Sequence, residues 1–250
     1  MPPDQNRPRP QPGGGGHRGQ SARKPSRPRP AGDRAERPRL ELSKPILQEL
    51  HATARPGKGE ILVKVFADAA AAYMEEDYAE AIRLGEQAKH IGLRSANARE
   101  LLGLAYYRTG KWSEAAKELS TFRRISGSTE QNPVIADAYR AMGKPDKALD
   151  IVREMDRKAL DEAVYYEGAI VGAGALADMD RLDEAIALLE RLELRPEVAG
   201  EHHLRTWYVL GDLLEKKGRF TQAKEWFEAV ASADADMTDA PDRARKLTRA

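Results

Sequence analysis

The chain of 250 residues contains no cysteine. This absence excludes disulfide bonds, thiolate metal sites and cysteine nucleophiles, and it is typical of proteins in a reducing compartment. Long apolar runs are also missing, because no stretch approaches the roughly 18 consecutive apolar residues that a membrane-spanning helix needs. The N-terminus carries charge but lacks the apolar core of a secretion signal. We therefore expect a cytoplasmic protein that does not insert into a membrane.

Residues 1–39 contain no Leu, Ile, Val, Phe, Tyr or Trp, so they have almost nothing to add to a hydrophobic core. They hold nine of the fifteen prolines and ten basic residues against three acidic ones, a net charge of +7. Residues 40–250 carry 31 basic and 37 acidic residues, a net charge of −6. Residues 1–39 have too few apolar side chains to offset the entropy cost of ordering the chain. This composition predicts a disordered basic arm over residues 1–39. The arm either contacts nucleic-acid phosphates without sequence specificity or only keeps the protein in solution.

The rest of the chain repeats one short phrase, a helix end followed by a turn and a helix start. An alanine in this phrase recurs at intervals of 34, 33, 37 and 38 residues, at Ala81, Ala115, Ala148, Ala185 and Ala223. Between the phrases the apolar residues follow helical spacing. This period indicates stacked helical hairpins, because a single hairpin cannot bury its apolar face without a neighbour. The predicted fold class is all-α, a superhelical solenoid of about five helix-turn-helix repeats.

The pattern divides the chain into four segments. They are the basic arm (1–39), a bridging and capping segment (40–59), the helical repeat domain (60–235) and a polar C-terminal tail (236–250). In the bridging segment, Leu42, Ile46, Leu47 and Leu50 are spaced to lie on one side of a short helix that docks on the first hairpin. The repeat units are expected near 62–95, 96–128, 129–160, 161–199 and 200–235.

Two of the units carry a family resemblance. The residues that carry it are Leu102, Gly103, Tyr106, Gly110, Trp112, Ala115 and Leu119 in the second unit, and Trp207, Leu210, Gly211, Leu214, Gly218, Phe220, Ala223 and Phe227 in the fifth. This order resembles the tetratricopeptide repeat, a helix-turn-helix unit of 34 residues. The resemblance covers about residues 62–235, and the longer intervals at its end predict lengthened helices or loops in the last two units.

The resemblance implies a right-handed superhelix whose concave face, lined mainly by the first helix of each unit, binds an extended or helical segment of another protein. The groove positions carried onto this sequence are Phe66, Ala70, Tyr73, Leu104, Tyr107, Arg108, Asp137, Arg140, Tyr208, Asp212 and Glu215. The alternative is that such side chains pack against the next repeat. Because the groove is aromatic at one end and carries carboxylates at the other, it suits an amphipathic partner segment with some basic character.

One subclass of the family grips the C-terminal carboxylate of chaperone tails. The corresponding positions here are Phe66, Ala70, Leu101, Glu130 and Val134, and none of them donates the required hydrogen bonds. The resemblance therefore does not imply a chaperone-tail clamp.

Motifs for chemistry are weak in this sequence. Residues 172–177 fit G-x-G-x-x-A, but no βαβ context surrounds them, so small residues for helix packing are the better interpretation. Gly168, Gly172 and Gly174 in one helix predict a weak fourth unit and a hinge there. His202 and His203 are adjacent and have no partner at i+4, which favours surface or capping residues over metal ligands. We expect no catalytic residues, no cofactor and no metal.

The leading hypothesis is a non-catalytic scaffold or adaptor that binds another protein in the repeat groove. The alternative is an RNA- or ribosome-associated protein whose basic arm contacts phosphates.

Overall fold

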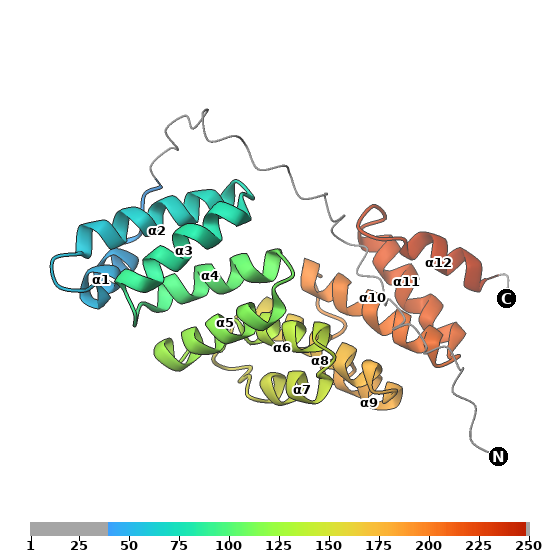
Figure 1. Cartoon of the computed structure of the whole chain (residues 1–250). Coiled ribbons are helices and arrows are strands. Elements are labelled where there is room, and N and C mark those ends of the chain that lie inside the picture. Colours follow the sequence, from blue (N-terminus) through green and yellow to red (C-terminus); the bar gives the residue numbers. More distant parts are fainter. Residues whose placement is uncertain (1–39, 249–250) are drawn as a thin grey trace, which may run out of the picture.

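The computed structural model describes residues 40–248, so the basic arm and its expected disorder lie outside the described residues. The described residues form twelve α-helices and no strand, which confirms the predicted all-α solenoid. Five hairpins follow one another along a curved path (Figure 1). None of the helices within residues 40–248 has both the length and the apolar character needed to cross a bilayer.

Each hairpin has a first and a second helix. The first helices are α2 (Gly59–Met74), α4 (Ala96–Arg108), α6 (Asn132–Ala141), α8 (Glu162–Asp178) and α10 (Glu201–Lys216). The second helices are α3 (Tyr78–Ile91), α5 (Trp112–Ser126), α7 (Pro145–Arg153), α9 (Leu182–Leu189) and α11 (Phe220–Ala233). Helix α1 (Lys44–Thr53) precedes the hairpins and α12 (Ala240–Leu247) follows them.

The turn inside every hairpin has the same backbone geometry. The positive-φ residue after the first helix is Glu76 (φ 59°), Gly110 (φ 73°), Gly143 (φ 68°), Asp180 (φ 61°) or Gly218 (φ 80°). In the second unit, the N–H of Lys111 donates to the Tyr106 carbonyl at 3.0 Å, which closes the left-handed helix end typical of a Schellman motif. The repeated phrase in the sequence therefore encodes a repeated turn.

Small residues let the two helices of a hairpin approach closely. A Cβ added to Gly103 would lie 2.6 Å from Cγ of Leu119, and one added to Gly211 would lie 2.8 Å from Cε1 of Phe227. The phrase alanines, Ala115 among them, are fully buried on the facing side. Side-chain packing at these points fixes the spacing of each helix pair.

Helix α8 contains the G-x-G-x-x-A segment, and this segment is continuous helix. A Cβ on Gly168 would lie 2.4 Å from Sδ of Met155, and one on Gly172 would lie 3.2 Å from Val152 and Leu188. The two glycines thus make room for side chains of the segment around α7 and of α9. This confirms the packing interpretation, and the hinge in this unit stays a prediction.

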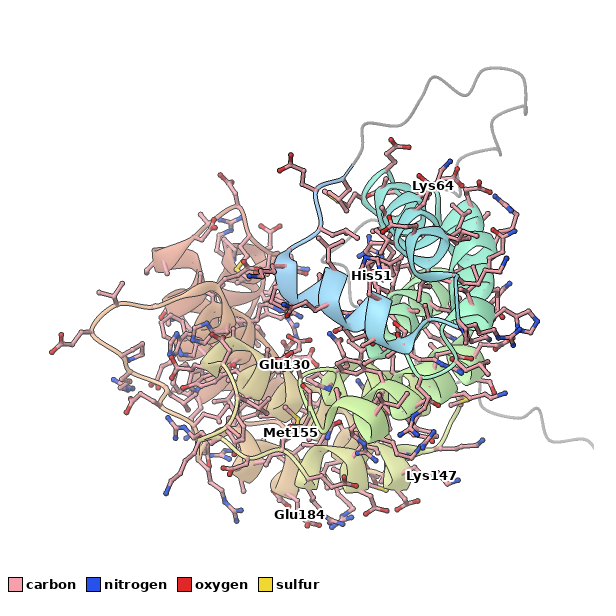
Figure 2. All side chains as sticks on the ribbon, turned by 90° about the vertical axis from the view of Figure 1, so that its left-hand side faces the viewer. His51, Lys64, Glu130, Lys147, Met155 and Glu184 are labelled. Carbon is pink, nitrogen blue, oxygen red and sulfur yellow. The ribbon has the colours of Figure 1, made fainter. Side chains whose placement is uncertain are left out.

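The first helices line the inner side of the curve. Consecutive first helices pack against each other along the whole series from α2 to α10, whereas consecutive second helices within residues 40–248 do not do so to a comparable extent. In Figure 2, Glu130, just before α6, lies in the middle of the molecule, while Lys147 of α7 and Glu184 of α9 lie at its lower edge. The predicted groove positions on the first helices therefore belong to the inner surface.

Helices α1 and α12 cover the two ends of the stack. Leu50 of α1 is fully buried in a cluster with Leu62 of α2. The Glu49 carboxylate accepts hydrogen bonds from Ser95 Oγ at 2.9 Å and from the Ala96 N–H at 2.5 Å. The positive N-terminal end of the α4 dipole also stabilises a carboxylate at this position.

The C-terminal segment 236–250 is more than the polar tail expected from the sequence, because it contains α12, which packs on α11. The buried side of α12 consists of Ala240 and Ala244. Two alanines in a charged segment give too weak an apolar pattern for the helix to be predicted.

Candidate functional site

The predicted groove residues fall into four groups, and the apolar ones form the first. Phe66 is only 6% exposed and packs in the cluster that also holds Leu50 of α1. Its assignment to the groove is therefore wrong, because the extra helix α1 closes this end of the stack. Ala70 and Leu104 are half-buried, and Leu104 packs against the main core.

A second group ties neighbouring first helices together. The hydroxyl of Tyr107 on α4 donates to Asp137 Oδ2 on α6 at 2.6 Å. Arg140 of α6 donates through Nη1 to Asp137 Oδ1 at 3.3 Å and through Nε to Asp178 Oδ2 on α8 at 2.8 Å. Burial, followed by the charge of Asp137 and the hydrogen bond to it, raises the pKa of Tyr107. For these polar atoms the alternative interpretation, contact with the next repeat, is correct.

The third group consists of the predicted residues of the fifth unit, which contact α12 and the residue before it. The Tyr208 hydroxyl donates to Asp239 Oδ1 at 2.7 Å, and Arg243 donates to Asp212 Oδ1 at 3.0 Å and to the Glu215 carboxylate. Burial opposes the charged guanidinium, but the hydrogen bonds to Tyr208, Glu215 and Asp212 raise the pKa of Arg243. The carboxylates that were expected to meet a basic partner at this end are already paired within the chain.

The fourth group, Tyr73, Tyr107 and Arg108, lies on the first two units. Together with Tyr78 and Trp112 it forms an aromatic surface. The rings of Tyr73 and Tyr78 meet edge to face with centroids 5.4 Å apart, and those of Tyr107 and Trp112 do so at 5.3 Å. The Arg108 guanidinium lies 5.2 Å from the centre of the Tyr78 ring. All four rings are half-buried, and burial raises the pKa of Tyr73.

Sequence reasoning did not assign a role to Tyr78 and Trp112. Both occupy the third position of the repeated phrase, directly after the turn. The recurrence of an aromatic residue at that position is a visible signal, but the resemblance places partner contacts mainly on the first helices. The structure adds these two rings because the start of each second helix lies beside the end of the first.

An acidic pair lies on the inner surface where the second and third units meet. The Gln131 amide donates from Nε2 to Glu100 Oε1 at 2.8 Å. Burial raises the pKa of Glu100, and the nearby charge of Glu130 adds to this effect. Within residues 40–248 neither Glu100 nor Glu130 has an ion-pair partner, so the pair offers negative charge to a cationic side chain.

We expect Glu100→Gln to stabilise the protein at pH 7. The native pKa lies above the ordinary value of 4.5, so the folded state holds this proton more tightly, and stability declines as the pH rises through the native pKa. The neutral amide of glutamine removes this pH-dependent loss of stability. The expected gain in the free energy of unfolding stays below about 1 kcal/mol, because the side chain is partly solvated. Thermal melts at pH 7 and pH 3 test this, with the exposed Glu225→Gln as the control. A gain of equal size at pH 3 would contradict the electrostatic cause.

Two protein-family models match the described residues. The tetratricopeptide repeat model matches residues 204–237, and the PPR repeat model matches residues 134–160. Over 108 residues the chain is 30% identical to DnaJ homolog subfamily C member 3 of Gallus gallus. This match covers 43% of the chain and 22% of the relative, so the chain spans less than a quarter of the length of this curated protein.

Solved tetratricopeptide structures share the same arrangement of helices. A thermophilic TPR protein of Thermus thermophilus is 18% identical and covers 76% of this chain and 100% of its own, with a TM-score of 0.53. A variant of the TPR-like repeats from a Podosopora anserina putative kinesin light chain is 19% identical, covers 78% and 100%, and has a TM-score of 0.58. YrrB, a TPR protein with an unusual peptide-binding site, is 17% identical, covers 73% and 89%, and has a TM-score of 0.51. At these identities the likeness shows the fold.

Proposed function

We propose that this tetratricopeptide-repeat protein is a non-catalytic scaffold that binds a segment of another protein on the inner side of its first two units. The observation that carries the proposal is the aromatic surface around Tyr73, Tyr78 and Trp112. Tyrosine, tryptophan and arginine are the residue types that most often dominate binding energy at protein interfaces. The third to fifth units are less suited, because most of their predicted polar contacts are used between helices.

The chemistry of α4 defines the partner segment. Glu100, Leu104 and Tyr107 follow one another at i, i+4 and i+7, so they lie on one face of this helix. Seven residues of α-helix span about 10 Å. A partner that places an aromatic or aliphatic side chain on the aromatic surface therefore brings a lysine or arginine about 10 Å further along to the Glu100 and Glu130 pair. YrrB, a TPR protein of the same fold, has an unusual peptide-binding site, which supports the proposal.

Panning a random peptide library on the full chain tests this function. We expect the selected peptides to combine a large apolar residue with a lysine or arginine. We also expect Tyr73→Ala with Arg108→Ala to weaken their binding by about 30-fold or more, as for truncated interface hot spots. Tyr107 is kept, since its hydroxyl holds α4 to α6. The matched control is Phe220→Ala, which removes an aromatic ring that is 50% exposed at the start of α11.

Three results separate the alternatives. Equal binding to the double variant and the control would contradict the assignment to the aromatic surface. Selection of acidic peptides would contradict the role of Glu100 and Glu130. A third result comes from capture of partners from a cell lysate. If this capture required residues 1–39 and disappeared after nuclease treatment, a nucleic-acid tether would replace the scaffold as the function.

A further inference from the structure

Three potential metal ligands meet where the fourth and fifth units join. Glu162 is the first residue of α8, and His202 and His203 lie in the first turn of α10. One ligand atom from each residue lies within 4.8 Å of the other two. His202 Nε2 is buried, has no hydrogen-bond partner within the described residues, and lies 3.6 Å from Glu162 Oε2.

We propose that Glu162, His202 and His203 bind a Zn²⁺ ion that joins α8 to α10. The separation of 3.6 Å is too long for a hydrogen bond. Two ligands at about 2.0–2.2 Å from one tetrahedral zinc ion lie roughly 3.4 Å apart, so a small shift of the exposed Glu162 side chain satisfies both bonds. Two histidines and one glutamate form a recognised zinc set, in which a water molecule takes the fourth position.

Packing holds the imidazoles close to this arrangement. The Tyr166 ring meets the rings of His202 and His203 edge to face, with centroid distances of 4.9 and 5.0 Å. The two imidazole centroids are 4.1 Å apart. His203 is only 4% exposed, which corrects its assignment as a surface residue, whereas the capping role holds.

Two opposing terms limit the affinity. His203 Nδ1 accepts the Gly200 N–H at 3.1 Å, and ligation of this ring gives up that bond. The N-terminal ends of α8 and α10 also disfavour a cation, because the helix dipoles place partial positive charge there. The ligand bonds to the ion have to outweigh both effects.

The site goes beyond the proposed scaffold function, because it lies far along the chain from the aromatic surface. Helices α8 and α10 are separated by α9 and by the longer connection over residues 190–200. The ion pair between Glu167 and Arg205, at 2.9 Å, is the other charged link between these two helices within the described residues. Zinc at the three ligands would clamp the two units at their junction.

The test is calorimetric titration of the full chain with ZnCl₂ at pH 7.5, together with thermal melts in zinc and in EDTA. We expect saturable binding of one ion per chain and a higher melting midpoint in zinc. His202→Ala and Glu162→Gln are expected to weaken binding by at least about tenfold, the lower end of the loss seen when groups around a metal are removed. The control is His51→Ala, because His51 also faces a carboxylate, Glu60 at 3.7 Å, but without a second histidine.

Circular dichroism of each variant keeps the test interpretable, and Glu162→Gln changes only an exposed helix-terminal residue. The proposal is overturned if the full chain shows no saturable zinc binding. It is equally overturned if folded Glu162→Gln and His202→Ala bind zinc as tightly as His51→Ala does.

Discussion

Replacement of Glu118 by alanine is expected to destabilise the second unit by about 3–5 kcal/mol, the usual cost of leaving a buried charge without its partner. Glu118 lies on α5 and is only 3% exposed. Its carboxylate accepts from Lys89 Nζ of α3 at 3.1 Å and from Arg99 Nη1 of α4 at 2.6 Å. One carboxylate thus joins three helices from two units.

The loss would spread because the cations have few other partners. Lys89 also donates to Glu86 at 2.6 Å, and Glu86 accepts the Tyr106 hydroxyl at 2.7 Å. The side chain of Arg99 is 16% exposed, and its Nε lacks a hydrogen-bond partner among residues 40–248. Without Glu118, Arg99 keeps the Leu93 carbonyl at 3.1 Å as its one remaining acceptor within these residues. Arg99 then has no carboxylate partner there, while Lys89 keeps Glu86.

Urea unfolding followed by circular dichroism measures this effect. Glu114→Ala is the matched control, because Glu114 is exposed on the same helix one turn earlier. Its substitution should change the free energy of unfolding by no more than about 0.5 kcal/mol. A Glu118→Ala variant as stable as the control would show that the network contributes no net stability. Glu118→Gln should fall between them, since the amide keeps hydrogen-bond acceptors but loses the charge.

The repeated phrase accounts for how well the fold could be predicted. Turn geometry, helix pairing and buried alanines all follow from local sequence, because residues within one hairpin are near neighbours along the chain. The longer intervals of 37 and 38 residues likewise predicted lengthened helices or loops in the last two units, where α8 has 17 residues and a longer connection runs over residues 190–200. Local sequence is enough to predict these features, because each unit buries its apolar face on the next one along the chain.

The proposed binding surface was less predictable from the sequence, for a physical reason. Side-chain pairs between units decide which residues remain free to contact a partner. Examples are Tyr107 with Asp137 and Asp212 with Arg243, which lie about 30 residues apart in the sequence. A bond to the neighbouring helix and a bond to a partner protein use the same residue types at the same helix positions. The sequence therefore placed these residues on the right helices without showing which of them were already bonded. Glu162 was missed for the same reason, since it lies in the unit before His202.

Phe227→Ala is expected to cost about 3–5 kcal/mol, the range for truncating a buried phenylalanine. The ring is fully buried beneath Gly211 of α10, where no Cβ intervenes. The Tyr208 ring meets it edge to face with centroids 5.7 Å apart, and the Arg243 guanidinium lies 4.3 Å from its centre. The same ring therefore supports both helices of the fifth unit and the cap α12.

The loss should be local, because each unit of a solenoid contacts only its neighbours. We expect hydrogen exchange of the Phe227→Ala variant to accelerate in α11 and α12, while α4 and α5 keep the protection of the parent chain. Phe220→Ala removes a ring from the same helix that is 50% exposed, and it should leave all exchange rates unchanged. Faster exchange spread evenly from α2 to α12 would mean that the units unfold as one. In that case the loss of the Phe227 ring would also destabilise the helices that carry the aromatic surface at the other end of the solenoid. Binding of a partner segment to that surface would then depend on the packing of α12.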